Sequence, residues 1–514
     1  MANNQTQVSL DNEKDDKDFV TAAISDHDGS DTRLSDNEPQ PIPWKYKWIA
    51  LACVISFPLG RRWASSTLGP LKNTLRNELD INNAQYGVIS SADGLVNTLL
   101  PIFGGMLLDW WGPNAVTLVC TTIMLGGNAL AAGATHLGKW RVLAAGNLIE
   151  GLGVAVLDSA QHKFFYHWFG ARDLGFAFGI DNAVAKAVGI VAGMAAIPIR
   201  DGTGHYQWAF WIAVIFCAVS WVINIGYVWF ANTIVPPQHR LTSARADAMA
   251  KNPNLKTKIV DWRILFTIPW AYMMFPLTQT LQAGGAGGFE NSAADIIRMK
   301  GYKEDVAGYM ATGQKILPIV LSPLIGIGMD RYGHRFHLVA LAPIFFIICC
   351  ALIGFTDLHP LVALVFGSLG DSFNALPIQI IIPLLVADQS KLGTAFGLWR
   401  AYNNSNTTIT DVVYGVLQDG TENMGYTKVL LFAIGIKAWG FVLGLLYIVL
   451  DFKKLGKGMT MTRHQREARL RAITDPENDP LTRRTPNKLI TTAALAVLTA
   501  LIIVAWILFF KYLT

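Results

Sequence analysis

Two similar stretches of the sequence indicate the architecture: Gly105-Met106-Leu107-Leu108-Asp109-Trp110-Trp111-Gly112 and Gly326-Ile327-Gly328-Met329-Asp330-Arg331-Tyr332-Gly333. Each stretch ends a long apolar run and forms a short, charged, glycine-bounded turn before the next run. A second echo strengthens the first, because Phe176-Ala177-Phe178-Gly179 recurs as Thr394-Ala395-Phe396-Gly397. The sequence therefore predicts two halves of similar design.

The composition indicates an integral membrane protein. Hydrophobic residues make up 52% of the 514 residues and charged residues only 15%, whereas charged residues are about 25% of an ordinary soluble domain. The five cysteines have no metal-ligand or disulfide spacing. The net charge is +5, and the basic residues are crowded into loops, which is typical of membrane topology rather than of nucleic-acid binding.

About twelve apolar segments have the length of roughly 20 residues that spans a bilayer. They lie near residues 46–68, 84–107, 115–137, 141–164, 174–198, 208–230, 263–283, 306–328, 337–355, 361–386, 393–417 and 428–450.

Charge and hydropathy divide the chain into six regions. Lys and Arg favour the loops that place both ends of the twelve-segment core in the cytosol. A last apolar stretch, at 489–510, has no polar face, so we expect it to span the membrane; a helix lying on the membrane is the alternative. We expect a disordered acidic tail at 1–43, an N-terminal six-helix bundle at 44–231, a cytosolic linker at 232–262, a C-terminal six-helix bundle at 263–452, a basic cytosolic tail at 453–487 and a thirteenth transmembrane helix at 488–514.

The repeated turn resembles the loop signature of the major facilitator superfamily, G-x-x-x-D-R-x-G-x-R, which joins the second helix to the third and the eighth to the ninth. The second copy is complete, whereas the first has Trp110 at the arginine position. The resemblance implies an all-α membrane protein with the major facilitator fold, two six-helix halves and here an extra C-terminal helix. Glycine lets helices approach closely, and an aspartate can cap a helix start and pair with a basic neighbour. The expected gating residues are Gly105, Asp109, Gly112, Gly326, Asp330, Arg331 and Gly333.

Polar residues inside the apolar segments mark a candidate site. A charge at mid-membrane costs roughly 2.5 to 3.5 kcal/mol, so each one suggests a cavity, a partner or a proton path. Arg400, Asn404, Thr407 and Asp411 form one stripe on the eleventh segment. We expect Asp158 to be the partner of Lys186; structural ion pairs between helices are the alternative to a substrate role. The candidate substrate-binding residues are Arg62, Asp93, Asp158, Lys186, Arg400 and Asn404.

Two longer strings narrow the resemblance. Ser159-Ala160-Gln161 and Leu392-Gly393-Thr394-Ala395-Phe396-Gly397 look like the branch typified by the lysosomal dipeptide transporters. In that family an acidic residue on the fourth helix and an arginine on the fifth are associated with the two ends of the peptide. Lys186 falls at the arginine position, and Ala155 falls at the acidic position, with Asp158 about one turn further on. The resemblance implies a lysosomal or vacuolar membrane, with the plasma membrane as the alternative.

The non-cytosolic loops contain no Asn-x-Ser/Thr sequon. In a lysosome or vacuole such loops would meet proteases, so we expect them to be short or to be covered by a glycosylated accessory subunit.

These observations favour a secondary-active or facilitative transporter of a small zwitterionic or anionic solute, such as a dipeptide or an amino acid, that works by alternating access. Arg62, Lys186 and Arg400 would bind a carboxylate, and Asp158 or Asp93 an amino group. There is no catalytic set, and the absence of G-x-x-x-x-G-K-[ST] argues against ATP-driven pumping. We expect no enzyme activity, cofactor, metal or nucleic-acid partner. The alternatives are an exporter of sugars, drugs or metabolites, and a transporter-like receptor or scaffold whose terminal helix and basic tail bind a partner.

Overall fold

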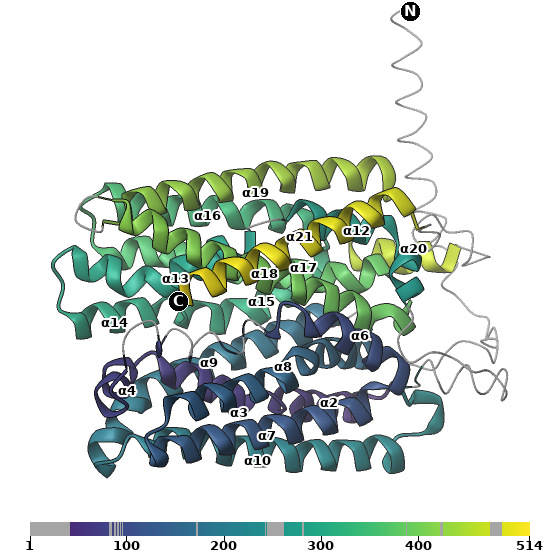
Figure 1. The fold of residues 1–514 in the computed structure, drawn as a ribbon. Coiled ribbons are helices and arrows are strands. Elements are labelled where there is room, and N and C mark those ends of the chain that lie inside the picture. Colours follow the sequence, from purple (N-terminus) through teal and green to yellow (C-terminus); the bar gives the residue numbers. More distant parts are fainter. Residues whose placement is uncertain are drawn as a thin grey trace, which may run out of the picture. The chain divides into compact units, whose positions relative to one another are not determined.

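A computed structural model gives the fold (Figure 1). It describes residues 42–81, 96–170, 173–241, 262–279, 282–386, 388–421, 425–472 and 486–513, and the single residues 85, 86, 89, 92, 94 and 243. Residues 1–41 of the acidic tail expected at 1–43 and most of the linker expected at 232–262 therefore lie outside the described residues. All that follows concerns the unit from Trp44 to Thr514.

Helices form both halves of this unit (Figure 1). The first half contains α2 (Trp44–Ser56), α3 (Leu59–Leu68), α4 (Lys72–Glu78), α6 (Leu100–Trp111), α7 (Pro113–Leu137), α8 (Trp140–Phe169), α9 (Leu174–Thr203) and α10 (Gln207–Trp229), followed by η1 (Phe230–Ile234) and η2 (Pro237–His239). The second half contains η3 (Trp262–Thr267), α12 (Trp270–Thr278), α13 (Gln282–Met299), α14 (Glu304–Gly313), α15 (Ile316–Tyr332), α16 (Arg335–Phe355), α17 (Pro360–Val386), η4 (Gln389–Lys391), α18 (Leu392–Asp419) and α19 (Thr427–Lys454). Two further helices follow, α20 (Arg463–Ala472) and α21 (Lys488–Leu513).

Nine helices among the described residues are long and apolar enough to cross a membrane. Helix α18 is not one of them, although it is 28 residues long, because its sequence carries charged and amide side chains such as Arg400, Asn404 and Asp411. A helix of this kind needs polar surroundings inside a membrane, since lipid cannot solvate its side chains.

Prolines and glycines set where several helices begin and end. Pro58 lies between α2 and α3 and lacks the N–H that a continuous helix would use, so the first span is broken there. Pro113 begins α7, and Gly138 and Gly204 end α7 and α9 in the left-handed conformation that glycine adopts readily.

The seventh span differs from the expected segment at 263–283. It consists of α12 (Trp270–Thr278) and α13 (Gln282–Met299), and therefore extends to residue 299. The sequence of α13, QAGGAGGFENSAADIIRM, is rich in glycine and polar residues, so its hydropathy is low and it resembles a loop. Close packing explains how it forms a helix: a Cβ on Gly284 or Gly288 would meet Thr410 or Tyr414 of α18.

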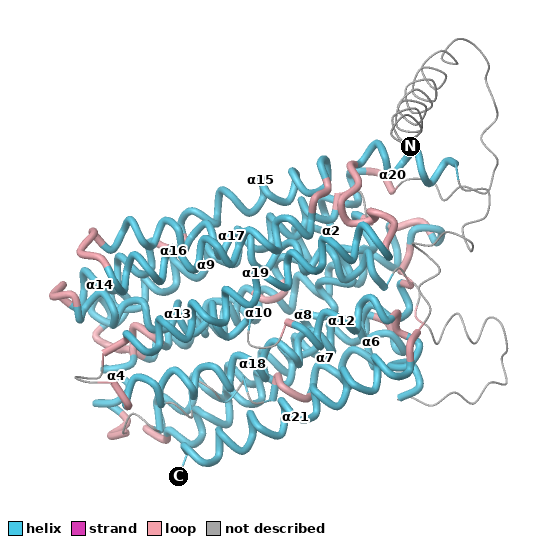
Figure 2. Tube along the Cα trace, turned by 90° about the horizontal axis from the view of Figure 1, so that it is seen from above, coloured by secondary structure: helices cyan, strands magenta, loops and turns pink. Residues whose placement is uncertain are grey.

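The terminal helix α21 packs along the outside of α12 and α18, and Figure 2 shows α21 beside α18. The Tyr402 hydroxyl of α18 donates to the main-chain oxygen of Ala494. Trp506 Nε1 donates to Thr98 Oγ1 at 2.9 Å, and Thr98 lies two residues before the start of α6 of the first half. Helix α21 thus contacts both halves.

Candidate functional site

Asp109 joins the two halves at one end of the bundle. Its carboxylate lies near the end of α6, is 1% exposed, and accepts hydrogen bonds from the main-chain N–H groups of Gly393 at 2.9 Å and Thr394 at 2.7 Å, at the start of α18. The Thr394 hydroxyl donates at 2.8 Å, and Lys163 of α8 forms an ion pair with the same carboxylate at 2.5 Å. The first N–H groups of a helix have no partner within the helix and carry a partial positive charge, so a carboxylate there is stabilising.

Asp330 repeats this arrangement with the halves exchanged. It lies near the end of α15 and accepts hydrogen bonds from the main-chain N–H groups of Gly175 and Phe176, both at 2.9 Å, at the start of α9. The echoed aspartates thus cap helices that begin with the echoed Phe-Gly strings. We call this end of the bundle, where α6 and α15 end and α9 and α18 begin, the capped end.

Glycines bring the capped helices into main-chain contact. A Cβ on Gly105 would meet the carbonyl oxygen of Gly393, and a Cβ on Gly326 would meet that of Gly175. Two further motif glycines have positive φ angles, 87° for Gly112 and 72° for Gly333, which favour glycine. The motif glycines therefore serve close approach in the first pair and turn geometry in the second. Arg331 lies over the ring of Tyr332 instead of joining the cap.

A third contact at the capped end involves the loop before α18. Gln389 Nε2 lies 3.1 Å from His167 Nδ1 of α8, and His167 Nε2 lies 3.0 Å from the main-chain oxygen of His239. In the same loop, partial burial tends to raise the pKa of Asp388, but hydrogen bonds from Ser390 and Lys391 outweigh it and hold the pKa below its usual value. Asp388 thus stays ionised at neutral pH and accepts from Ser390 N at 3.0 Å.

Arg62 pairs within the first half. Its Nη2 lies 2.8 Å from Asp181 Oδ1 of α9, and Gln161 Nε2 of α8 donates to the same oxygen at 2.8 Å. Arg62 Nη1 is buried and has no hydrogen-bond acceptor among the described residues. The arginine is thus held by a carboxylate and keeps one donor for another group.

Arg400 pairs between the halves. Its Nη2 lies 2.5 Å from Asp158 Oδ2, so α18 contacts α8, and Arg400 Nε has no acceptor in the part of the chain that the structure describes. One turn after Asp158, His162 lies between the two echoed phenylalanines, with ring centroids 5.0 Å from Phe178 and 4.8 Å from Phe396. This cross-half pair therefore adjoins the helix starts of the capped end.

Lys186 also pairs between the halves, but with other residues than expected. The sequence predicted Asp158 as its partner, and that prediction is wrong because Asp158 is engaged by Arg400. Lys186 Nζ instead forms ion pairs with Asp371 of α17 and, at 3.5 Å, with Glu290 of α13. Helix α9 packs against α15 and α17, which places Lys186 beside the second half.

Weaker contacts also join the two halves. Asn404 Nδ2 donates to the main-chain oxygen of Asn97 at 3.0 Å, and Asn182 Nδ2 of α9 donates to Ser322 Oγ of α15 at 3.0 Å. Along the expected stripe of α18, Arg400 and Asn404 are half-buried and Asp411 is exposed. Asp93 lies outside the described residues.

The three cations that we expect to bind a solute carboxylate are already paired in this structure. Each of Arg62, Lys186 and Arg400 has a carboxylate partner. The low dielectric of a membrane interior makes an unpaired charge costly, and pairing removes most of that cost.

Sequence reasoning missed two residues of this network, Lys163 and Glu290. Lys163 is 1% exposed and neutralises Asp109. Glu290 lies beyond the end of the seventh segment as it was predicted, in the glycine-rich α13. The signal that could have revealed both is a charged residue on the face of a helix that also carries small residues.

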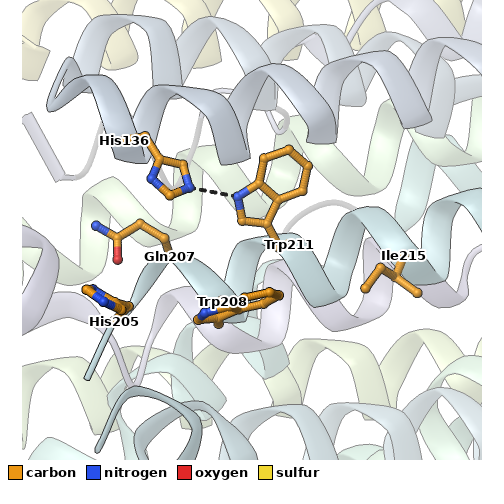
Figure 3. A pocket seen from close by; sticks show the side chains of 6 residues that line it. All are labelled: His136, His205, Gln207, Trp208, Trp211 and Ile215. Atoms are coloured by element: carbon orange, nitrogen blue, oxygen red, sulfur yellow. Dashed lines mark hydrogen bonds between the residues drawn. The ribbon is translucent and has the colours of Figure 1, made fainter. Parts of the chain in front are cut away.

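A separate pocket of about 460 Å³ lies at the opposite end of the first half, lined by His136, His205, Gln207, Trp208, Trp211 and Ile215 (Figure 3). Trp211 Nε1 donates to His136 Nε2 at 2.9 Å. His136 is in the last turn of α7, whereas α7 begins at the capped end. None of the expected site residues lines this pocket.

Comparison with known proteins identifies the architecture. The family model described as Major Facilitator Superfamily matches residues 59–289, which include the first repeated turn. The chain also superposes on the solved structure of the transporter FucP with a TM-score of 0.57 at 16% identity, over 77% of this chain and 98% of FucP. Residues 59–289 thus match the major facilitator superfamily, and the chain has the major facilitator fold.

Two further transporters are similar to this chain over most of their length. The lysosomal dipeptide transporter MFSD1 of Danio rerio is 21% identical over 434 residues, which are 82% of this chain and 90% of the relative. The proton:xylose symporter XylE superposes with a TM-score of 0.59 at 11% identity, over 80% of this chain and 95% of XylE. The expected all-α major facilitator fold and the expected resemblance to the lysosomal dipeptide transporters are confirmed, and the names of these relatives are those of transporters.

Proposed function

We propose that this protein is a secondary-active or facilitative transporter of a small zwitterionic or anionic organic solute, such as a dipeptide or an amino acid, and that it works by alternating access. The observation that carries the proposal is the pair of ion pairs between the halves, Arg400–Asp158 and Lys186–Asp371. A charged ligand can compete for either partner of such a pair and so change how the halves are held together. The Danio rerio relative is named a lysosomal dipeptide transporter, which supports the choice of solute.

The cations have the geometry of carboxylate receptors. Lys186 and Arg400 each reach across the interface between the halves, and Arg62 and Arg400 keep a buried N–H without an acceptor among the described residues. We assign Asp158 and Asn404 to the same site because they contact Arg400 or share its helix face. Asp93 stays a candidate from the sequence.

The caps of Asp109 and Asp330 hold the capped end shut in this proposal. Both join helices of different halves, so rocking the halves apart at this end requires both carboxylates to leave their helix starts. The motif glycines allow the helices of the two halves to come into contact, and the aspartates hold them together.

The capped end faces the cytosol in this proposal, because Lys453 and Lys454 lie in the last turn of α19, Lys457 and Arg463 follow it there, and basic residues favour the cytosolic side. The amino terminus and the linker are then cytosolic, and the carboxyl terminus, beyond α21, is not. Protease protection in sealed vesicles tests this topology: a carboxyl-terminal tag cleaved together with an amino-terminal tag would contradict it.

The proposed location is a lysosomal or vacuolar membrane, where a glycosylated accessory subunit would cover loops that carry no sequon of their own. The lysosomal name of the MFSD1 relatives supports the location. Imaging of tagged protein together with organelle markers tests it, and tagged protein found only at the plasma membrane would contradict it. Recovery of a glycosylated membrane protein with the purified transporter tests the partner.

A ligand screen tests the solute class. Purified protein is heated with amino acids, dipeptides, organic acids and sugars, because a ligand of the native state raises the apparent stability. We expect stabilisation by zwitterions or carboxylates. Stabilisation by sugars alone would contradict the proposal.

A further inference from the structure

The ion-pair cluster of Lys186, Glu290 and Asp371 has a feature that binding of a solute carboxylate by Lys186 does not explain. One ammonium group, on α9 of the first half, is shared by two carboxylates, on α13 and α17 of the second half. The side chains of Lys186 and Glu290 are 17% and 24% exposed, so the cluster is accessible at its Glu290 side.

The two contacts of Lys186 differ in closeness. Its ammonium lies directly against Asp371, whereas the distance to Glu290 is 3.5 Å. Charge-assisted hydrogen bonds usually measure about 2.7–2.9 Å. Glu290 therefore keeps acceptor capacity that Lys186 does not use.

We infer that Glu290 and Asp371 form the binding site for the ammonium group of the transported solute, and that Lys186 occupies this site in the empty transporter. On binding, the solute's ammonium takes the place of the Lys186 ammonium between the two carboxylates, and the released Lys186 binds the solute's carboxylate. This inference rests on the proposed function and specifies its substrate class as zwitterions.

We expect selectivity for zwitterions, because the ligand must leave each charged group of the cluster with a partner. A zwitterion adds no net charge and supplies a partner for each group that it separates. A simple anion would draw Lys186 away and leave two carboxylates facing each other, and a simple cation would displace Lys186 without giving it a new partner. Separating a buried pair in this way is strongly unfavourable.

Two other lysines affect the charge of this cluster. Lys315, which precedes α15, interacts electrostatically with Glu290, and Lys437 of α19 with Asp371. Lys437 is 1% exposed and is held by the main-chain oxygen of Gln282 at 2.8 Å. The positive charge of both lysines would favour binding of an anion. An N-acetylated solute, which is an anion, is therefore the most demanding probe of the inference.

The exchange also explains why the cluster spans the halves. Lys186 connects them directly in the empty transporter, and the zwitterion connects them in the loaded one. Both forms keep the charges paired, so both can rock between their two orientations.

The test measures binding and proteoliposome uptake of three probes by wild-type protein: alanyl-alanine, its N-acetylated form and its carboxyl amide. We expect the dipeptide to bind about tenfold or more tightly than either blocked form. Equal binding of the N-acetylated form by a protein that transports the dipeptide would overturn the inference and leave the proposed function standing. Binding and uptake of none of the three probes, with a solute of another class transported instead, would overturn both.

Variants then locate the ammonium site. In Glu290→Gln and Asp371→Asn we expect dipeptide binding to weaken about tenfold or more, and binding of the N-acetylated form to weaken less or to improve, since Lys186 is held less tightly. Asp295→Asn, an acid on the same helix α13 that pairs with Arg298 outside the cluster, is the matched control. The conservative variant Asp371→Glu, which keeps the charge, should retain the preference for the dipeptide. A full preference for the dipeptide in both Glu290→Gln and Asp371→Asn would overturn the inference.

Discussion

The carboxylate of Asp109 on α6 accepts two hydrogen bonds from Thr394 on α18, one from the main-chain N–H at 2.7 Å and one from the hydroxyl at 2.8 Å. Asp330 on α15 binds the main-chain N–H of Phe176 on α9 in the equivalent place. The same latch thus occurs twice, with each half supplying the aspartate once and the helix start once. This reciprocity ties the two repeats of the sequence to one mechanical function, closure of the capped end.

Asp109→Asn should weaken this end more than Asp330→Asn does. The change leaves buried Lys163 without a counter-ion, and breaking a buried pair in this way typically costs about 3–5 kcal/mol. No ion pair of Asp330 is found among the described residues, so Asp330→Asn loses only part of two hydrogen bonds, worth about 0.5–1.5 kcal/mol each. Thermal unfolding of purified protein gives the order of stability. Equal stability of the two variants would show that Lys163 does not depend on Asp109.

Gly326→Ala should separate α9 from α15. The added methyl group would meet the carbonyl oxygen of Gly175, and overpacking of this kind typically costs about 1–3 kcal/mol. Gly328→Ala is the matched control on the same helix, because no atom lies within 4 Å of its added Cβ. Labelling of single cysteines introduced at the capped end should speed up in Gly326→Ala only. The same labelling rate in both variants would argue that this glycine is not needed for closure.

Arg400→Ala should abolish uptake and also lower stability, because it leaves Asp158 without its partner. The double variant Arg400→Ala with Asp158→Ala removes both charges and should recover much of the stability while uptake stays lost. Comparing unfolding and uptake in the two variants separates a substrate role from a structural one. Recovery of uptake in the double variant would make the pair purely structural.

Trp506→Phe should loosen the terminal helix from the first half. The change removes the indole N–H that donates to Thr98, a loss of about 0.5–1.5 kcal/mol, and keeps most of the ring. Trp439→Phe, at an exposed tryptophan of α19, is the control. If α21 restrains the rocking of the halves, uptake should rise in Trp506→Phe while stability falls. Unchanged uptake and unchanged stability would exclude a role for this contact.

The sequence predicted the fold better than the site. The repeated aspartates and glycines indicated two halves of similar design, because the helix cap needs the same residue types in each copy. The partner of Lys186 could not be predicted, since it depends on which helices of the other half lie beside α9, and spacing along one helix carries no such information. Glu290 was hidden because glycine-rich α13 has a low hydropathy, and its helix is stabilised by close packing on α18 rather than by apolar side chains.

The most direct test of the central claim is uptake of a labelled dipeptide, alanyl-alanine, into proteoliposomes that contain the purified protein. We expect saturable uptake by the wild type and loss of uptake in Lys186→Ala, since the variant lacks the cation that receives the solute's carboxylate. Lys428→Ala, at an exposed lysine near the start of α19, should transport normally. Equal uptake by wild type and Lys186→Ala would contradict the proposed site, because the cross-half cluster would then be structural and the solute would bind elsewhere.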